Sequence, residues 1–407
     1  MKKFYQFLIA AVVVTASCST AHSAEPKLLP EELLKAGWVQ LFDGESLFGW
    51  RATGGAKWEV KEGEIRTDGA KPGFLMSTSE WGDYELSLEF RAPADTNSGV
   101  FLRTPTEPKD PARDCYELNI APADNPFPTG SFVARQKAEN PSPSPSPERG
   151  RGSEVRGGES DSDDWHTFKV VAWEGWITVE LDGERVADYT DKSPVRIGHI
   201  GLQSNRGPVA FRNIRLRPIE LMPQLSLGNL VNFNTDRAEK CSFEVNADKE
   251  LHVTNGPGQI ETKLEYANFV LQLECKVDGV GLNSGIFFRT LREGRWAGYE
   301  SQINNVFKDD DRSKPADFGT GGIYRRQPAR RIVAEDGEWF FKTIVADGPH
   351  VAVWVNGYQV SDWTDTRPEK ENAREGLRLG PGVIAIQGHD PTTNFWFRNI
   401  QVAELPR

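Results

Sequence analysis

Apolar and polar side chains alternate through much of this chain, as they do in β-strands with one buried face. Tyr84, Leu86, Leu88 and Phe90 are separated by polar or charged residues, and residues 269–275 repeat the pattern. A period of two places the apolar side chains on one face of a strand. We therefore expect strands whose apolar faces line a core.

Turn signals follow several of these runs. The alternating run at 177–181 ends at Asp-Gly, and the run at 351–355 ends at Asn-Gly. These dipeptides after an alternating run are the strongest short-range signal for a hairpin. One good helix candidate stands out, residues 30–36, which enters at a proline and stops at Gly37. Short strands with frequent turns predict an all-β fold, a sandwich or jelly roll.

The two halves of the chain contain the same motifs in the same order. The pairs are N-S-G-V-F-L-R-T at 97–104 with N-S-G-I-F-F-R-T at 283–290, Y-E-L-N-I at 116–120 with Y-E-S-Q-I at 299–303, T-G-S-F at 129–132 with T-G-G-I at 320–323, W-H-T-F-K at 165–169 with W-F-F-K-T at 339–343 after a small shift in register, L-D-G at 181–183 with V-N-G at 355–357, and F-R-N-I at 211–214 and 397–400. A shared order indicates domain duplication. The period far exceeds that of solenoid repeats, so each copy should be a complete domain.

The motif spacing sets the expected domain limits. We place the first copy at 37–220 and the second at 229–407, with the boundary near 220–228. The first copy holds extra residues, including a Pro-, Ser-, Gly- and Arg-rich segment at 139–163 that we expect to be a mobile loop. The second copy regains the length in a charged loop near 366–378.

The N-terminus has the features of a targeting segment. Two lysines precede an apolar run at 7–14, which is too short to span a bilayer, and small residues follow. We predict a signal peptide at 1–23 and export to the periplasm or the medium. In the alternative, T-A-S-C is a lipobox and Cys18 is lipidated. We prefer soluble export, because Thr15 stands where a lipobox usually has Leu, Val or Ile.

Composition narrows the classes of function. The 407 residues are 38% hydrophobic and 26% charged, which is globular and excludes a disordered chain. The 48 Lys and Arg against 59 Asp and Glu give a net charge of -11, which argues against non-specific nucleic-acid binding. The 12 Trp and 22 Phe suit β-rich folds and sites that stack on sugar rings.

The cysteines and acidic runs give little sign of a cofactor. Cys241 and Cys275 would be the favoured disulfide pair, but Cys275 continues an alternating run and is better read as a buried small hydrophobe. No Cys and His spacing resembles a zinc site. The run Asp309, Asp310 and Asp311 is read as a solvated loop, with a calcium or other divalent-metal role conceivable. We predict no cofactor.

Several motifs together resemble a known family. They are G-W-V-Q-L-F-D-G at 37–44, L-F-G-W at 47–50, the N-S-G-x-F-x-R strand, Y-E-x-Q-I, T-G-x-I-Y and the closing F-R-N-I. They look like the bacterial 3-keto-disaccharide hydrolase family, long a domain of unknown function. The resemblance covers nearly all of the mature chain, twice. It implies two tandem concanavalin-A/laminin-G-like jelly-roll β-sandwiches.

The resemblance also implies an activity, the cleavage of sugars oxidised at C3. A ketone at C3 acidifies the C2 proton, so a base can remove it and the group at C1 can leave by elimination. Water can then add back. Such a site needs a base, an electrophile for the enolate oxygen and an acid for the leaving group.

The second copy can supply these groups. Glu300 lies in an otherwise uncharged strand, and His389 matches a His in the family's closing motif, so we assign both as catalytic. Gln302, two residues on from Glu300, points to the same face, and an Arg fork suits an enolate or sugar hydroxyls. The predicted substrate-binding residues are Arg289, Gln302, Tyr324 and Arg398, with Glu117 and Arg103 of the first copy.

Plainer interpretations stay open. Glu117 and Glu300 could be strand carboxylates paired with an Arg, and Arg398 could staple two sheets through backbone carbonyls. The first copy has Asn205 where the second has His389, and Asn exchanges no proton near neutral pH. The alternative function is therefore a tandem lectin-like module that binds carbohydrate without chemistry. The sequence leaves the oligomeric state open.

Overall fold

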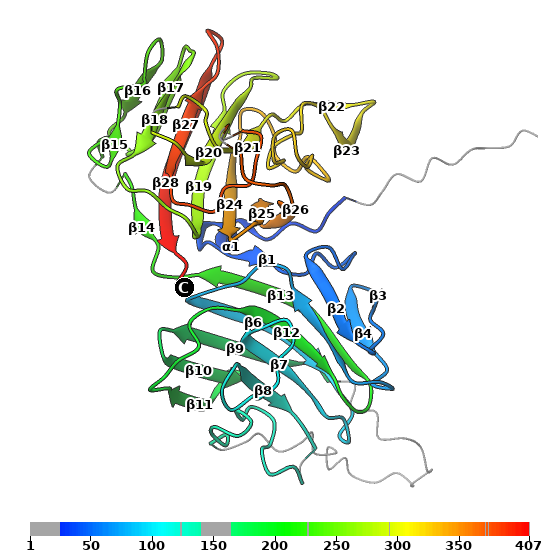
Figure 1. The fold of residues 1–407 in the computed structure, drawn as a ribbon. Coiled ribbons are helices and arrows are strands. Elements are labelled where there is room, and N and C mark those ends of the chain that lie inside the picture. Colours follow the sequence, from blue (N-terminus) through cyan, green and yellow to red (C-terminus); the bar gives the residue numbers. More distant parts are fainter. Residues whose placement is uncertain are drawn as a thin grey trace, which may run out of the picture.

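The chain folds into two β-sandwiches, one after the other along the sequence (Figure 1). This computed structural model describes residues 25–122, 124–139, 164–225, 228–292, 294–370, 372 and 374–406. The predicted signal peptide, Cys18 and nearly all of the predicted loop at 139–163 lie outside these residues. Two tandem jelly-roll sandwiches are the architecture that the sequence predicts, and the structure confirms it.

The first domain packs an eight-stranded sheet against a five-stranded sheet. The larger sheet runs β11 (Glu184–Thr190), β10 (Trp176–Leu181), β9 (His166–Trp173), β6 (Tyr84–Arg91), β13 (Val209–Pro218), β4 (Glu64–Thr67) and β3 (Glu59–Lys61), with β1 (Val39–Gln40) beside β13. The smaller sheet runs β2 (Trp50–Gly54), β5 (Gly73–Ser77), β12 (His199–Ser204), β7 (Ser98–Thr104) and β8 (Tyr116–Ile120).

The second domain repeats this arrangement. Its eight-stranded sheet runs β16 (Ser242–Val245), β17 (Leu251–Thr254), β28 (Asn394–Glu404), β19 (Phe269–Val277), β24 (Trp339–Asp347), β25 (His350–Val355) and β26 (Tyr358–Thr364), with β14 (Met222–Pro223) beside β28. Its five-stranded sheet runs β15 (Phe233–Asn234), β18 (Gly258–Thr262), β27 (Val383–Gly388), β20 (Ser284–Thr290) and β21 (Tyr299–Ile303). A hairpin of β22 (Phe307–Lys308) and β23 (Asp311–Pro315) follows β21.

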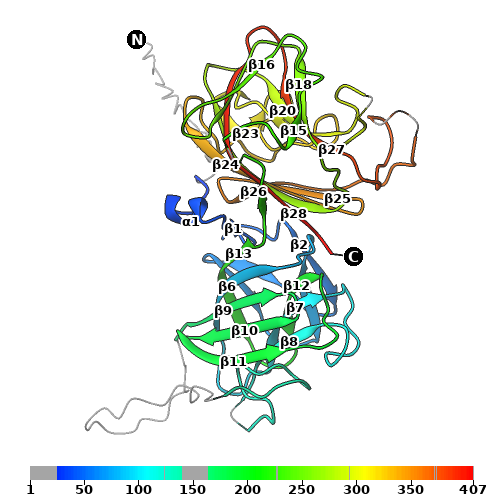
Figure 2. The ribbon, with the colours of Figure 1, turned by 90° about the vertical axis from the view of Figure 1, so that its left-hand side faces the viewer.

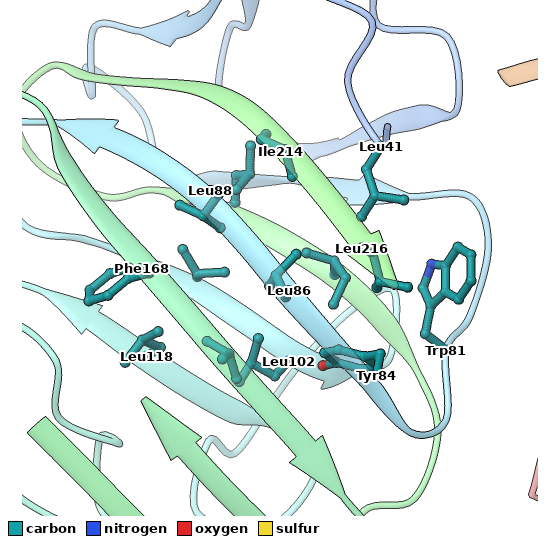
Figure 3. Close-up of a cluster of buried hydrophobic side chains, with 14 of the residues drawn as sticks. Leu41, Trp81, Tyr84, Leu86, Leu88, Leu102, Leu118, Phe168, Ile214 and Leu216 are labelled. Carbon is teal, nitrogen blue, oxygen red and sulfur yellow. The ribbon is translucent and has the colours of Figure 1, made fainter. Parts of the chain in front are cut away.

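The alternating residues form the cores, as predicted. Tyr84, Leu86, Leu88 and Phe90 are buried between the sheets of the first domain, where Figure 3 shows the first three of them among other apolar side chains. In the second domain the equivalent run ends at Cys275, which is fully buried as a small hydrophobe. The thiols of Cys241 and Cys275 are both free, so they form no disulfide with each other.

The F-R-N-I motif marks a β-bulge in each domain. Asn213 and Asn399 have positive φ values of 51° and 50°, and the pairing register shifts beside each of them. The Asn399 amide donates a hydrogen bond to Glu274 on the neighbouring strand, and the Arg398 guanidinium forms an ion pair of 2.7 Å with the same carboxylate. An unpaired residue in a bulge needs such side-chain partners. The recurrence of this motif is therefore explained by structure.

The pairing register also aligns the two domains residue by residue. Phe168 pairs with Leu181 just before the Asp-Gly turn, and Lys342 pairs with Val355 just before the Asn-Gly turn. Phe168 and Lys342 are thus equivalent positions. The register shift that the sequence suggested for this motif is wrong, because a core Phe in one copy has been replaced by a Lys in the other.

The two sandwiches lie against each other, as Figure 2 shows, and apolar side chains from both form one cluster. The outer face of the second domain's large sheet carries Trp354, whose ring centroid lies 5.6 Å from that of Trp81 in the first domain. The Trp354 indole N–H donates to the Gln40 carbonyl, and Arg330 forms a 2.8 Å ion pair with Asp43. These contacts hold the two domains together.

The predicted helix is confirmed as α1 (Glu31–Lys35), which lies between the two sandwiches in Figure 1. Pro30 precedes it, and Gly37 follows with a φ of +88°, a conformation in which glycine carries no steric penalty. Across the residues that the structure describes, no helix has the length and apolar character needed to cross a membrane.

Candidate active site

The outer face of the second domain's five-stranded sheet carries Glu300. On β21, Tyr299, Ser301 and Ile303 point into the core, so Glu300 and Gln302 point away from it. Loops cover this face, and Glu300 is only 6% exposed. A nearly buried carboxyl group outside the apolar core is unusual and requires specific partners.

Gly285 on β20 makes room for the Glu300 side chain. The two strands pair so that Gly285 lies beside Gln302 and Phe287 lies beside Glu300. A Cβ atom at residue 285 would stand 2.6 Å from Glu300 Oε1 and 2.9 Å from its Cγ. The glycine of the N-S-G motif therefore allows the Glu300 side chain to approach the backbone of β20 closely.

One guanidinium group and one carboxylate set the electrostatics of Glu300. Arg374 Nη2 lies 3.0 Å from Glu300 Oε2. Burial raises the pKa of Glu300 to about 7, a rise that the positive charge of Arg374 opposes and the nearby Asp317 carboxylate reinforces. Near neutral pH the group can therefore both accept and hold a proton.

Polar and aromatic side chains surround this pair. The Gln302 amide donates to the Asp317 carboxylate at 2.8 Å, which fixes the carboxylate next to the site. Tyr324 donates its backbone N–H to the Glu300 carbonyl, and its ring centroid lies 5.8 Å from the Arg374 guanidinium carbon. Both predicted binding residues, Gln302 and Tyr324, therefore lie beside Glu300.

A row of near-parallel rings leads from Phe287 to His389. The Trp296 ring centroid lies 6.3 Å from that of Phe287 and 6.3 Å from that of His389, with interplanar angles of 15° and 8°. His389 is partly exposed, and its Nδ1 lies 2.8 Å from the Asp390 carboxylate. The rings of Trp296 and His389, which are partly exposed, are suited to stacking on a sugar ring, whereas Phe287 is buried beneath them.

Glu300 and His389 stand at opposite ends of this row. Phe287, the neighbour of Glu300, pairs with Ala385 on β27, and His389 follows four residues later. With strands about 4.8 Å apart and a rise of about 3.3 Å per residue, their Cα atoms are roughly 15 Å apart. The two groups lie on one face, as predicted, at opposite ends of the row of rings.

Arg289 and Arg103 are structural, contrary to their predicted role in sugar binding. Arg289 is fully buried, and its guanidinium donates to the carbonyls of Ala267, Gly348 and Arg378 at 2.6 to 2.8 Å. The equivalent Arg103 is also fully buried and donates to three carbonyls in the first domain. Such a fork ties separate loops together and leaves no face for a ligand.

Arg398 is also corrected, because it belongs to the other sheet. It lies on the outer face of β28, paired with Glu274 and Glu250, whereas Glu300 lies on the outer face of the opposing sheet. The whole sandwich separates the two. The plainer interpretation was that Arg398 joins the two sheets by donating to backbone carbonyls. The structure gives that role to Arg289 instead.

The first domain has a reduced form of the same site. Glu117 occupies the position of Glu300 and is 8% exposed. Burial raises its pKa to about 7, opposed by a hydrogen bond from Gln203. Asn205 follows β12 where His389 follows β27, and residues 105–115, which match the loop of Trp296, contain no aromatic side chain.

Comparison with known proteins identifies this chain. The 3-keto-alpha-glucoside-1,2-lyase-like domain family matches residues 37–217 and again residues 229–403, which is most of the chain. The chain belongs to the 3-keto-alpha-glucoside-1,2-lyase-like family. It is thereby a carbohydrate-active protein built from two copies of that domain.

Individual relatives are distant. A 3-keto-disaccharide hydrolase of Bacteroides thetaiotaomicron is 22% identical over 235 residues, covering 45% of this chain and 79% of the relative. Two crystal structures of candidate glycosyl hydrolases from Parabacteroides distasonis are 18% and 27% identical. They cover 48% and 46% of this chain and all of theirs, with TM-scores of 0.38 and 0.37.

Within this lyase-like domain, sequence reasoning missed Arg374 and Asp317. Arg374 comes from the charged loop near 366–378, where the second copy regains its length, and that extra length was the available signal. Nothing local marked Asp317, because its link to Gln302 depends on how the chain returns after β23.

No metal site emerges among the described residues, where His, Cys, Asp and Glu form no group able to hold an ion. In the Asp309–Asp311 run, which the sequence interpreted as solvated, Lys314 pairs with Asp309 at 3.2 Å and with Asp311 at 3.6 Å.

Gly285→Ala tests the fit around Glu300. The added methyl group must displace the carboxylate, and misplacing a reacting group by about 1 Å can cost about 100-fold in rate. We expect turnover of a 3-keto-glycoside to fall roughly 10- to 100-fold while the unfolding midpoint changes little. Gly99→Ala in the first domain is the matched control and should leave turnover within about twofold. Equal losses in both variants would contradict this geometry.

Proposed function

We propose that the second domain cleaves glycosides of 3-keto sugars by elimination across C1 and C2, with Glu300 as the base. The observation that supports this most is the buried Glu300 carboxyl group, whose pKa is raised to about 7 and which lies 3.0 Å from Arg374. A base of this strength can remove a proton made acidic by an adjacent ketone. The guanidinium beside it can stabilise the negative charge that develops.

The proposed chemistry is balanced without a further reactant. Glu300 takes the C2 proton, and the electron pair of that C–H bond forms the C2=C3 double bond of an enolate. Arg374 donates hydrogen bonds to the enolate oxygen. The enolate then collapses, the C1=C2 double bond forms, and the bond from C1 to the leaving oxygen breaks. That oxygen takes up a proton, for which protonated Glu300 is the candidate donor on this face.

The remaining side chains fit sugar binding. Trp296 offers an aromatic face between Phe287 and His389. Because the Cα atoms of His389 and Glu300 are roughly 15 Å apart by strand geometry, we assign His389 to the far end of a bound glycoside, where it would donate or accept hydrogen bonds. Its predicted catalytic role therefore becomes a binding role in this proposal.

The first domain suits binding better than reaction. Burial and a hydrogen bond from Gln203 set the pKa of Glu117, and no cation among the described residues contributes to it, whereas Arg374 lies beside Glu300. Without a nearby cation, the negative charge that develops on an enolate oxygen would receive little stabilisation at this site. We propose that the first domain, if it contacts sugar, does so without chemistry, and that the whole chain is exported by its N-terminal segment.

The decisive assay compares a 3-keto-glucoside with its parent glucoside. The purified full-length protein should release the aglycone from the ketone only, and in D₂O it should exchange the C2 proton of the ketone substrate. Release from both substrates at similar rates would contradict the elimination mechanism. Binding of either sugar without release or exchange would instead support the lectin-like alternative.

A further inference from the structure

A lysine is buried in the core of the second domain, directly behind the strand of Glu300. Lys342 lies on β24 of the opposing sheet and is 1% exposed. Its Nζ donates hydrogen bonds to the carbonyls of Ser301 at 3.1 Å and Gln302 at 2.8 Å. These are the two residues that follow Glu300. The side chain of Lys342 therefore spans the core and hydrogen-bonds to β21 next to the candidate base.

The first domain shows that the fold does not need this lysine. By register, Phe168 replaces Lys342 and Leu118 replaces Ser301. Both are fully buried in the first core, where Figure 3 labels them. An apolar pair suits a core better than an amine, since burying a charged group is costly. Only the second domain, in which Arg374 lies beside Glu300, buries Lys342 against Ser301 in its core.

We infer that Lys342 is a positioning residue for Glu300, holding β21 from the core side and stabilising the carboxylate through the strand. The inference rests on the proposed function only in naming Glu300 as a base. The contact itself, between an interior ammonium group and the two carbonyls after Glu300, is independent of the reaction.

The charges around the two groups support this coupling. Burial lowers the pKa of Lys342 to about 7, a fall that Cys275 and Glu300 oppose. Glu300 faces Arg374, Asp317 and Arg325 from the loops, in addition to Lys342 from the core. Each charged form favours the other, so loss of the ammonium group should make Glu300 harder to ionise.

The direction of the effect on pH dependence follows. If Glu300 acts unprotonated, activity rises as the pH rises through its pKa. Removing Lys342 raises that pKa, so the acid limb of the pH profile should move to higher pH. A purely structural role would change stability and leave the limb in place.

The test is Lys342→Met in the full-length protein, with the titration of Glu300 followed by ¹³C NMR of labelled glutamate carboxyl groups. Glu300→Gln identifies the signal. We expect the pKa of Glu300 to rise by up to about one unit, because Lys342, with a pKa of about 7, is partly protonated where Glu300 titrates, and one full charge at several ångströms in a medium of effective dielectric constant near 20 has about that effect. Where turnover is measurable, the acid limb should shift by the same amount.

Two further variants control the result. Lys276→Met removes a lysine of β19 that lies over the rings of Trp339 and Trp396 on the outer face, and it should not move the Glu300 signal. The double variant Lys342→Phe with Ser301→Leu copies the first domain's pair and should raise the pKa of Glu300 as Lys342→Met does, in a folded protein.

The readouts separate this inference from the proposed function. An unmoved Glu300 titration in both folded Lys342 variants would overturn the positioning role, whatever the activity. A shifted titration in a protein that never turns over a 3-keto-glycoside would support the coupling and reject the assignment of Glu300 as the base of that reaction.

Discussion

Glu300→Gln should lower turnover of a 3-keto-glycoside by roughly 10²- to 10⁴-fold, the usual contribution of a positioned general base. The amide keeps the shape of the side chain but cannot accept the C2 proton. Its folding should be retained, because a neutral group replaces a carboxyl that burial already disfavours in its charged form. Steady-state release of the aglycone, with urea unfolding of the same samples, measures both effects.

The pH profile and the first domain provide the controls. The folded pKa of Glu300 is about 7, so wild-type activity should rise as the pH increases through 7. Glu117→Gln makes the same change at the equivalent site, where no Arg among the described residues contributes to the pKa of the carboxyl group, and should reduce turnover less than about tenfold. Equal losses in the two variants would indicate a site shared between the domains and contradict the assignment to the second.

Arg289→Met should destabilise the protein by about 3 to 5 kcal/mol, the range for breaking a buried, hydrogen-bonded charged group. The change removes a fully buried guanidinium and leaves three partly buried carbonyl oxygens, those of Ala267, Gly348 and Arg378, without their donor. Each unsatisfied buried acceptor costs free energy. Urea unfolding followed by tryptophan fluorescence measures the loss.

An exposed ion pair gives the matched control. Arg185 is half exposed and pairs with Asp188 at 3.3 Å, so Arg185→Met should cost less than about 0.5 kcal/mol. At temperatures where Arg289→Met remains folded, its KM for the sugar should match that of the wild type. A normal unfolding midpoint together with lost sugar binding would restore the predicted binding role of Arg289.

The repeated motifs separate into two kinds once the fold is known. Arg289 and the F-R-N-I residues recur because they tie loops together and stabilise a bulge, and Tyr299 recurs because its hydroxyl donates to Asp365 inside the domain. Glu117 and Glu300 recur on an outer face, where burial raises the pKa of each to about 7. Repetition in a sequence therefore marks structural and chemical residues alike.

The sequence by itself determined the two-copy organisation, the strands, the turns and the short helix, and it singled out Glu300. These features are local, because a period of two, an Asn-Gly turn or a proline entry is encoded within a few neighbouring residues. Only the tertiary structure decided which cation meets which carboxylate. Arg374 is 74 residues from Glu300 along the chain, and Lys342 reaches the two residues after Glu300 from the opposing sheet. The same reason explains why Arg289 and Arg398 were misassigned. The sequence around an Arg at the end of a strand is similar whether its side chain enters the core, lies on an outer face or lines a binding site. Only long-range packing distinguishes these environments.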